Sequence, residues 1–405
     1  AAISACQKAS QWSKALASLR AMRPRRVLPN DVTYRAAIRA CAQGARWFEA
    51  LGLLSEMRPA GVNPSVSTCN QAIFACGQAA CWHEAVGVLL AMRELGVAPN
   101  EFTHNSAVSA CSKGARWFEA LRLFAELQER STALGVMTYN TAIGACGIGA
   151  QWLEALGLLA DMQLRHLEMD VLTYKAAIFA CGNSAQWPEA LGLHFGMQGS
   201  SLHPQGETCS AAILACHRGA RWSEALALLR DMWPRRVTPD VKSFTAAISA
   251  CDLGAQWIDA LECFSEMQRC HVEPNVFTYG TAMNACQAGA QWLKALELFV
   301  GMRAHRSDPN AVCYNIAIKA CGAVALWGEA LGIFADVRRR HQELHQDTYN
   351  AAVIACSQGS RWHEALSILR DAQGGIVGPD EITYHATISA CGRGACWQEA
   401  GSLLQ

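Results

Sequence analysis

The chain has 405 residues, 51% of them hydrophobic, and its 34 basic and 34 acidic residues cancel to zero net charge. No apolar run approaches the ~18 residues that a membrane span needs, so we expect no transmembrane segment and no membrane partner. Zero net charge also argues against a nucleic-acid partner, unless the charges are segregated onto different faces.

Single residues repeat with a period of 35. Trp recurs at this spacing from Trp12 to Trp397, and only Trp233 departs from it. Cys and Ala show the same period, beginning at Cys6 and Ala15. A fixed period of this size is typical of a solenoid, in which each unit packs only on its neighbours. We therefore predict an all-α solenoid of helix-turn-helix repeats.

Each unit is expected to contain two helices. In the repeat over 136–170, Tyr139, Ala142 and Cys146 fall on one helical face, and Gly149 ends that helix. A second helix with the same spacing begins at Trp152. Most closing loops carry a proline, which cannot continue a helix. These prolines are Pro64, Pro99, Pro204, Pro239, Pro274, Pro309 and Pro379.

The units form one array over residues 1–405, with a partial repeat at 1–30, ten complete repeats at 31–380 and a partial repeat at 381–405. The chain opens inside a first helix and ends inside a second one. We expect it to be a piece of a longer protein, whose targeting segment and further domains lie outside this sequence.

Twelve of the 19 cysteines occupy the buried side of a first helix, and we expect them to pack as free thiols in a reducing compartment. Cys76 and Cys81 flank a turn, as do Cys391 and Cys396, but no C-x-x-C or His cluster accompanies them, so no metal or other cofactor is expected. The recurring Trp is assigned to packing between units rather than to base stacking.

The sequence contains no catalytic motif of the G-x-S-x-G, P-loop or H-E-x-x-H kind, so we expect no enzyme activity. Second helices carry recurring acids, and first helices carry mostly bases such as Arg39 and Arg218. This segregation weakly indicates a polyanion on the first-helix face. Solvated faces with charges matched to the helix dipoles explain it equally well.

Two positions vary within the constant frame, and short polar side chains dominate both. The first follows the Thr-Tyr pair of the first helix: Arg35, Asn70, Asn105, Asn140, Lys175, Ser210, Thr245, Gly280, Asn315, Asn350 and His385. The second ends the loop: Asn30, Ser65, Asn100, Gly135, Asp170, Gln205, Asp240, Asn275, Asn310, His345 and Asp380. An N-cap explains the loop position and a polar surface explains the helix position, but neither explains why both vary together.

The unit resembles the pentatricopeptide repeat in its plain 35-residue form. The resemblance rests on the opening V-x-T-Y motif (VLTYK at Val171, EITYH at Glu381), the G-x-W-x-EA-L middle and the closing V-x-P-D/N motif (237–240, 272–275). The related 34-residue peptide-binding repeat has a different pattern, which is absent. The resemblance implies a right-handed superhelix whose first helices line a groove. Single-stranded RNA would lie there 5′ to 3′ from the N-terminal repeat, with the two variable residues reading one base per repeat.

The chemistry of such reading follows from donors and acceptors. A loop Asp only accepts, which suits U and G, whereas a loop Asn can donate to A or C. A small hydroxyl in the helix leaves room for a purine, and the longer Asn suits a pyrimidine. Applied from Asn70–Asn100 to Asn350–Asp380, these rules give 5′-C-Y-U-N-G-A-N-Y-U-3′, with U at Asn140–Asp170. Arg35–Ser65 and Lys175–Gln205 fit no pairing, since long cations suit phosphate better.

The resemblance also implies an apolar residue that stacks on each base, three residues before the helix reader. Val32, Phe102, Met137, Leu172, Phe277, Val312 and Ile382 suit this role. Ser67, Glu207, Lys242 and Asp347 depart from it. A phosphate contact near the end of the first helix is implied for Lys8, Lys113, Arg218 and Arg393. With cations in so few units, we expect modest affinity and a shallow salt dependence.

The implied function is sequence-specific RNA binding in the processing, stability or translation of transcripts, in a mitochondrion or plastid. The protein would act by occupying a transcript or by recruiting a protein effector. Two alternatives remain: a peptide-binding scaffold, and an enzyme subunit whose nuclease or deaminase domain lies beyond this sequence.

Overall fold

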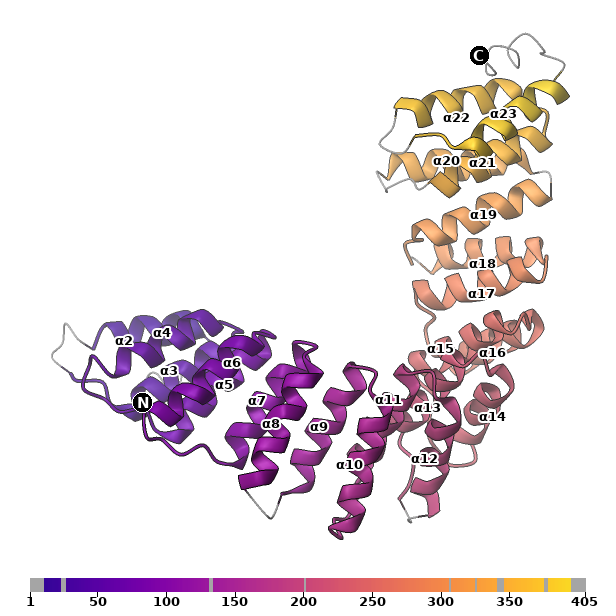
Figure 1. Cartoon of the computed structure of the whole chain (residues 1–405). Helices are drawn as coiled ribbons and strands as arrows, with labels where there is room; N and C mark the ends of the chain where they lie inside the picture. The colour runs from indigo at the N-terminus through magenta and orange to yellow at the C-terminus, as the bar shows by residue number, and fades with distance from the viewer. Residues whose placement is uncertain are drawn as a thin grey trace. The chain divides into compact units, whose positions relative to one another are not determined.

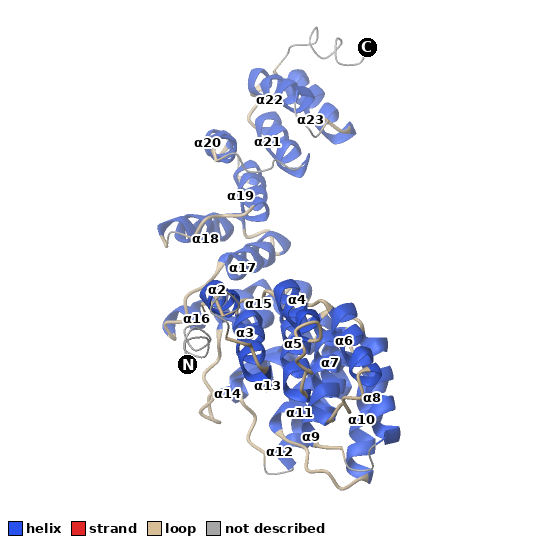
Figure 2. Cartoon of the chain, turned by 90° about the vertical axis from the view of Figure 1, so that its left-hand side faces the viewer, coloured by secondary structure: helices blue, strands red, loops and turns tan. Residues whose placement is uncertain are grey.

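The computed structural model describes residues 11–22, 27–130, 134–199, 202–305, 307–324, 326–340, 346–374 and 378–394. Over these residues the chain is helical without any strand, as Figures 1 and 2 show. The first helices of the hairpins are α3 (Asp31–Gln43), α5 (Val66–Gln78), α7 (Glu101–Lys113), α9 (Val136–Ile148), α11 (Val171–Asn183), α13 (Gly206–Arg218), α15 (Val241–Leu253), α17 (Val276–Ala288), α19 (Ala311–Ala323), α21 (Gln346–Gln358) and α23 (Glu381–Arg393). The second helices are α2 (Trp12–Arg20), α4 (Trp47–Met57), α6 (Trp82–Glu94), α8 (Trp117–Arg130), α10 (Trp152–Leu164), α12 (Trp187–Gly199), α14 (Trp222–Met232), α16 (Trp257–Arg269), α18 (Trp292–Ala304), α20 (Trp327–Arg339) and α22 (Trp362–Gly374).

The hairpins group into two compact units, Ala1–Ala215 and Cys216–Gln405. Within each unit, a first helix packs along the first helix of the next hairpin, as α5 does on α7 in the first unit and α19 on α21 in the second. Second helices pack on the first helix of their own hairpin and on that of the next, as α6 does on α5 and α7 and α18 on α17 and α19. The predicted all-α solenoid of helical hairpins is confirmed.

The seam between first helices is built from small and medium apolar side chains. In α9, Tyr139, Ala142, Ile143 and Cys146 are fully buried. The recurring cysteines that the structure describes, from Cys41 to Cys391, are likewise buried and free, which confirms core packing. Burial raises the pKa of the Cys146 thiol to about 12, so it stays protonated and unreactive at neutral pH.

The Trp of one hairpin packs on the Gly that ends the next first helix. A Cβ built on Gly149 would lie 2.4 Å from the Trp117 ring, and Gly114 and Trp82 show the same relation. Gly149 has φ −80°, whereas Ala150, the next residue, adopts the left-handed φ of 53°. The helix ends at Gly149 as predicted, but this glycine supplies space for Trp117 rather than backbone freedom. The assignment of Trp to packing between units is confirmed.

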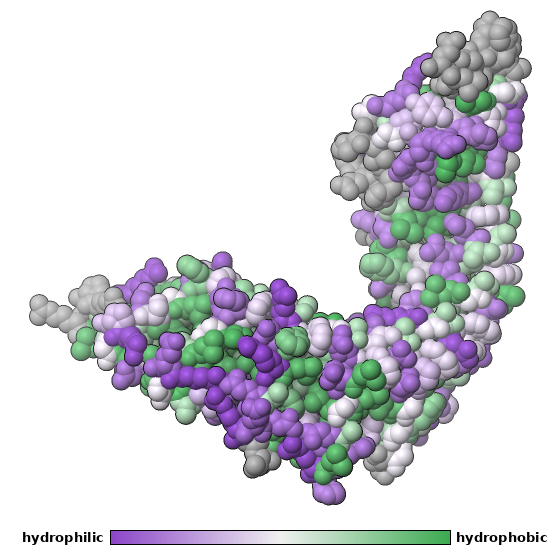
Figure 3. Space-filling view, viewed as in Figure 1, coloured by the Kyte–Doolittle hydropathy of each residue, from purple (hydrophilic) through white to green (hydrophobic). Residues whose placement is uncertain are grey.

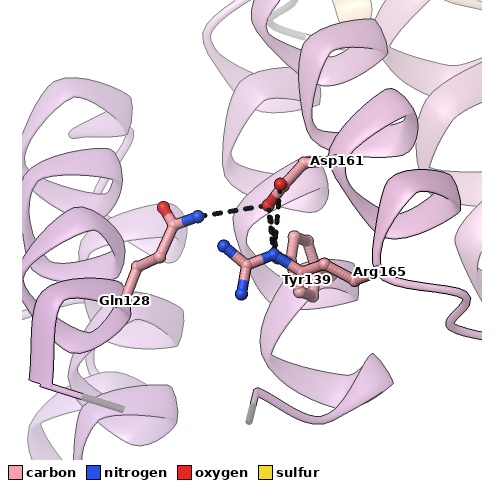
Figure 4. A network of polar contacts seen from close by, with 4 residues as sticks. All are labelled: Gln128, Tyr139, Asp161 and Arg165. Carbon is pink, nitrogen blue, oxygen red and sulfur yellow. Dashed lines mark hydrogen bonds and ion pairs between the residues drawn. The ribbon is translucent and has the colours of Figure 1, made fainter. Parts of the chain in front are cut away.

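The seam between second helices is held by polar side chains. Asp161 in α10 accepts hydrogen bonds from the Tyr139 hydroxyl, from Gln128 at the end of α8 (3.2 Å) and from Arg165 (3.1 Å), as Figure 4 shows. The equivalent acid in the second unit, Glu266, accepts from the indole N–H of Trp233 (3.1 Å). Trp233, the one Trp outside the 35-residue spacing, therefore serves the same seam.

The helices in the described ranges are all too short or too polar to cross a membrane. Among the same residues, no three His, Cys, Asp or Glu side chains come close enough to hold a metal ion.

Candidate nucleic-acid interface

The loop residue of each repeat begins the next first helix. Asp170 has extended backbone geometry, and its side chain accepts a hydrogen bond from the Thr173 amide, which makes it the N-cap of α11. The same capping bond is formed by Asn30, Ser65, Asn100, Asp240, Asn275, Asn310 and Asp380. The N-cap explanation of the loop position is therefore correct for these residues. The question is whether a capping side chain retains hydrogen-bonding capacity for a ligand.

In the first unit, Asn140 and Asp170 form one polar cluster with Thr173. Asn140 Nδ2 donates to Asp170 Oδ1 (3.1 Å), and Asn140 Oδ1 accepts from the Thr173 hydroxyl (2.6 Å). The Thr173 amide also donates to Asp170 Oδ1 (2.8 Å). In this repeat the two variable side chains are therefore in direct contact.

Asp170 keeps an open acceptor. The hydrogen bonds from Asn140 and from the amide and hydroxyl of Thr173 all use Oδ1, and the Leu172 amide also stabilises the carboxylate. The side chain is exposed, so it can still accept from a ligand. Burial raises the pKa of Asp170, but hydrogen bonds from Thr173 and Asn140 outweigh this effect and hold the pKa below its ordinary value. The group is therefore a carboxylate at neutral pH and can only accept, as a base-reading residue for an imino N–H must.

The second unit contains the same cluster. Asn350 Nδ2 donates to Asp380 Oδ2 (3.0 Å), and the Thr383 amide donates to Asp380 Oδ1 (2.8 Å). The Thr383 hydroxyl donates to Asn350 Oδ1. The two repeats that were predicted to read the same base thus share the contact between the helix Asn and the loop Asp. They differ in that Asp380 accepts on both oxygens, whereas Asn140 and Thr173 both donate to Asp170 Oδ1.

Where the loop residue is not Asp, the helix Asn is less fully bonded. The Oδ1 atoms of Asn70, Asn105 and Asn315 are buried and accept no hydrogen bond within the described structure. At the first of these, the Thr103 hydroxyl donates to Asn100 instead (2.8 Å). An unsatisfied buried acceptor costs about 1–3 kcal/mol, which a donor from a ligand would recover.

A different pair occupies the repeat that was predicted to read A. The Thr245 hydroxyl lies 2.8 Å from the Thr278 hydroxyl, and Asn275 Oδ1 accepts from the Thr278 amide (2.9 Å). In the following repeat, Gly280 is buried and Asn310 caps the Cys313 amide (3.0 Å). Thr245 thus contacts the start of the next first helix, whereas Gly280 has no side chain that could do so.

In one repeat an ion pair occupies the candidate site. Lys175, at the helix position, pairs with Glu207, which stands where an apolar stacking residue was expected. The two exposed charges neutralise each other, which removes both the cation suggested for phosphate and the acid expected to repel it. The cap residue of that repeat, Gln205, accepts from the Thr208 hydroxyl through its backbone carbonyl (2.8 Å).

The remaining candidates lie at separate places. Ser210 lies in the first unit and donates to the Gly206 carbonyl (2.6 Å), and its predicted partner Asp240 lies in the second unit. Arg35 is half-buried and His385 is exposed. Lys8 and His345 lie outside the described residues.

The apolar residues three positions before the helix readers form an exposed row along each unit. They are between 51% and 72% exposed, although large apolar side chains elsewhere in the first helices are mostly buried. The row comprises Val32, Phe102, Met137, Leu172, Phe277, Val312 and Ile382. Exposed apolar groups beside polar pairs are the arrangement that a stacked, hydrogen-bonded base requires.

The cations expected near phosphate also bridge successive first helices. Lys113 Nζ donates to Gln78 Oε1 (2.9 Å), and Arg393 donates to the Ser357 carbonyl (3.2 Å). Arg218 is exposed in the same part of its helix. They lie eight residues along the helix from the readers, or about 12 Å at 1.5 Å per residue.

The first helices of the first unit also line a hollow of about 510 Å³, on the face that carries the candidate residues. Residues of α3, α5 and α7 line it, among them Arg39, Gln43, Phe74 and the stacking candidate Phe102. Phe74 is a candidate that sequence reasoning missed, although it recurs as Phe179 and Ile354 at the same exposed position. The spacing of these residues could have revealed it. Figure 3 shows the first unit's surface in that view as mixed apolar and polar areas rather than one apolar patch.

Two carboxylates also escaped the sequence analysis. Asp31 Oδ1 accepts from the Ser65 amide (3.3 Å) and the Thr68 hydroxyl (2.6 Å). Glu101 Oε1 accepts from the Gly135 amide (2.9 Å) and the Thr138 hydroxyl (2.6 Å). In both cases an acid at the start of one first helix reaches the start of the next, 34 residues away.

Comparisons with known proteins agree with the repeat pattern. A model of the pentatricopeptide repeat domain matches residues 52–114 and 227–289, and a model of the PPR repeat matches residues 32–61, 102–131, 137–167 and 347–374. Together these matches cover more than half of the chain. A search of curated proteins finds no match.

The fold is shared with a solved structure. The crystal structure of the pentatricopeptide repeat protein PPR10 from maize is similar with a TM-score of 0.57 at 20% identity, over 99% of this chain and 72% of that chain. PPR10 in complex with an 18-nt psaJ RNA element gives a TM-score of 0.44 at 23% identity, over 99% and 57%. The PPR domain of Arabidopsis thaliana protein-only RNase P 1 in complex with tRNA gives 0.38 at 13% identity, over 42% and 90%.

Proposed function

The chain belongs to the pentatricopeptide repeat family, and we propose that it binds single-stranded RNA along its first helices, with about one base for each repeat. The observation that carries the proposal is the Asn140–Asp170 cluster, in which one carboxylate oxygen caps a helix while the other stays open and exposed. Asn350 and Asp380 form a related contact in the second unit, in which Asp380 accepts on both oxygens.

Each base would meet three kinds of side chain. An exposed apolar group such as Met137 would stack on its face, the polar pair would bond its edge, and cations such as Lys113 would meet the phosphate. The favoured strand is 5′-C-Y-U-N-G-A-N-Y-U-3′. The protein would perform no chemistry and would act by covering a transcript or recruiting an effector, in a mitochondrion or plastid.

The test is binding of the full chain to this strand, followed by fluorescence anisotropy, with a scrambled strand as competitor. We expect the scrambled strand to bind at least tenfold more weakly, since one wrong base typically costs about 1–3 kcal/mol. Equal competition by the scrambled strand would contradict the proposal. The double variant Asn140→Ala, Asp170→Ala should lose the preference for U at the third base. Phe118→Ala, on a second helix, removes an exposed aromatic ring elsewhere and should leave binding unchanged.

A protein-binding scaffold is the second candidate, and a groove between second helices favours it. The groove has a volume of about 370 Å³ between α4 and α6, and its lining includes Leu51, Leu54, Val88 and Leu95. Arg58 and Ala91 both line the groove, whereas at the equivalent places one repeat later Arg93 pairs with Glu126 (2.5 Å). The lining also includes Glu84, but Arg58 forms no ion pair with the described residues, so the groove suits an apolar peptide with an acidic side chain near Arg58.

Ala91→Glu would separate the two candidates. The new carboxylate would pair with Arg58 and fill the groove, so capture of an acidic, apolar peptide should be lost while RNA binding is kept. If the variant instead lost RNA binding, the assignment of RNA to the first helices would be wrong.

A further inference from the structure

The repeat that contains Asn105 lacks the side chain expected to read its base. Its loop residue is Gly135, which offers no acceptor and no side-chain cap for α9. Sequence reasoning therefore allows only a pyrimidine at this position. The structure places a carboxylate from another residue at the same point.

That carboxylate belongs to Glu101, the first residue of α7. Its Oε1 accepts from the Gly135 amide (2.9 Å) and from the Thr138 hydroxyl (2.6 Å). A Cβ built on Gly135 would lie 3.1 Å from this oxygen, so the carboxylate lies where a loop side chain would begin. Asp170 makes the equivalent contact with Thr173, whose hydroxyl lies 2.8 Å from Asp170 Oδ1.

The two carboxylates are also alike in that each uses one oxygen for the start of a first helix. Asp170 uses Oδ1 alone for the start of α11, and Glu101 uses Oε1 alone for the start of α9. These contacts leave the second oxygen of each side chain unused, and both side chains are exposed. Each can therefore accept one N–H from a ligand.

An acid stands at this helix start in the two repeats whose loop residue is short, Asp31 with Ser65 and Glu101 with Gly135. Where the loop residue is itself Asn or Asp, the equivalent residue has no carboxylate: Val66, Val136, Gly206, Val241, Val276 and Gln346. In the repeats that end in Gln205 and His345, the equivalent residues Val171 and Ala311 carry no carboxylate either, so the replacement is a feature of particular repeats.

We propose that Glu101 supplies the hydrogen-bond acceptor that Gly135 lacks, so that the Asn105 repeat selects uracil over cytosine. The inference rests on the proposed RNA-binding function and sharpens it at one position. An acceptor-only carboxylate can bond the N3–H of uracil, whereas the unprotonated N3 of cytosine would face it with a second lone pair.

The experiment measures binding of the full chain to the strand 5′-C-Y-U-N-G-A-N-Y-U-3′ with U or C at the second base. We expect U to bind roughly tenfold more tightly, the size of about 1.4 kcal/mol. Glu101→Gln replaces one acceptor oxygen by an N–H donor and should abolish or invert this preference. Glu381→Gln removes the same charge at the first position of another first helix and should leave it unchanged.

A second variant distinguishes the loss of the acceptor from a loss of folded structure. In the double variant Glu101→Gln, Gly135→Asp the acceptor moves to its usual place, and the preference for U should return. Circular dichroism confirms that each variant folds. A folded double variant without the preference, or a Glu101→Gln variant that keeps it, would overturn the assignment to Glu101.

The third base separates this result from the function itself. U or C at that base tests Asn140–Asp170, which Glu101→Gln should not alter. Discrimination at the third base with none at the second would sink only the inference about Glu101. No discrimination at either base would sink the proposed function with it.

Discussion

Tyr139 and Asn140 are neighbours in the sequence, yet they belong to two polar clusters of opposite character. Tyr139 points to the seam between second helices, where Asp161 accepts hydrogen bonds on both oxygens (Figure 4). Asn140 faces the start of the next first helix, where Asp170 uses one oxygen only. Both carboxylates have a pKa below the ordinary value, so both are charged at neutral pH.

The difference lies in how completely the protein satisfies each group. A carboxylate bonded on both oxygens holds neighbouring hairpins together and has little left for a ligand. A carboxylate bonded on one oxygen caps a helix and still offers an acceptor. Substitutions in the seam should therefore change stability without changing base preference, and substitutions at the helix starts should do the reverse.

The largest effect on stability is expected at the contact between Gly149 and Trp117, where the packing leaves no room for another atom. Gly149→Ala places a methyl group 2.4 Å from the Trp117 ring, so Trp117 must move. We expect the free energy of unfolding to fall by about 3 kcal/mol, measured by urea denaturation. Gly157→Ala in the adjacent α10 has no atom within 4 Å of the new methyl group and should stabilise the helix by about 1 kcal/mol. Equal effects of the two substitutions would contradict this account of the glycine.

A third carboxylate, Asp252, represents the opposite case, a side chain that receives no hydrogen bond from the described residues. It lies near the end of α15, and no described residue donates a hydrogen bond to its side chain. Burial raises its pKa to about 6, and the nearest titratable group that it affects, Cys286, is a protonated thiol. The folded state therefore binds a proton more tightly than the unfolded state between pH 4 and pH 6, so stability falls as pH rises through this window.

Asp252→Asn should remove that dependence. The two pKa values correspond to about 3 kcal/mol, which we reduce to about 2 kcal/mol because the side chain is only partly buried. The variant should match the wild type in urea denaturation at pH 4 and exceed it at pH 7. A constant difference at both values of pH would exclude titration as the cause.

Asp161, the carboxylate between the second helices, should affect stability less than Asp252 does. Asp161→Ala leaves the Tyr139 hydroxyl and Gln128 without their acceptor, and we expect a loss of about 1.5 kcal/mol in urea denaturation. The preference for U at the third base should not change, because Asp161 takes no part in the Asn140–Asp170 cluster. An altered base preference in this variant would break the division between the two clusters.

The 35-residue period was enough to predict the helical hairpins, the buried Cys, the Trp that packs between hairpins, and the location of the variable pairs. It could not show that Gly149 makes room for Trp117, because that contact joins residues of successive hairpins. The same limit hid the Glu101–Gly135 contact and the Lys175–Glu207 pair, which span 34 and 32 residues. Periodicity identifies equivalent positions, whereas these contacts depend on how the side chains of two different repeats meet.

The smallest effect on stability is expected from Asp170→Asn, and this makes it the sharpest test of the comparison. Asn100, Asn275 and Asn310 cap their helices as Asp170 does, so an amide at residue 170 should preserve the cap. Urea denaturation should change by less than about 0.5 kcal/mol, whereas Asp170→Ala should cost about 1 kcal/mol. The amide can present an N–H where the carboxylate only accepted, so the third base should shift from U toward C. If Asp170→Asn kept the preference for U at unchanged stability, the open oxygen of Asp170 would not be the atom that reads the base.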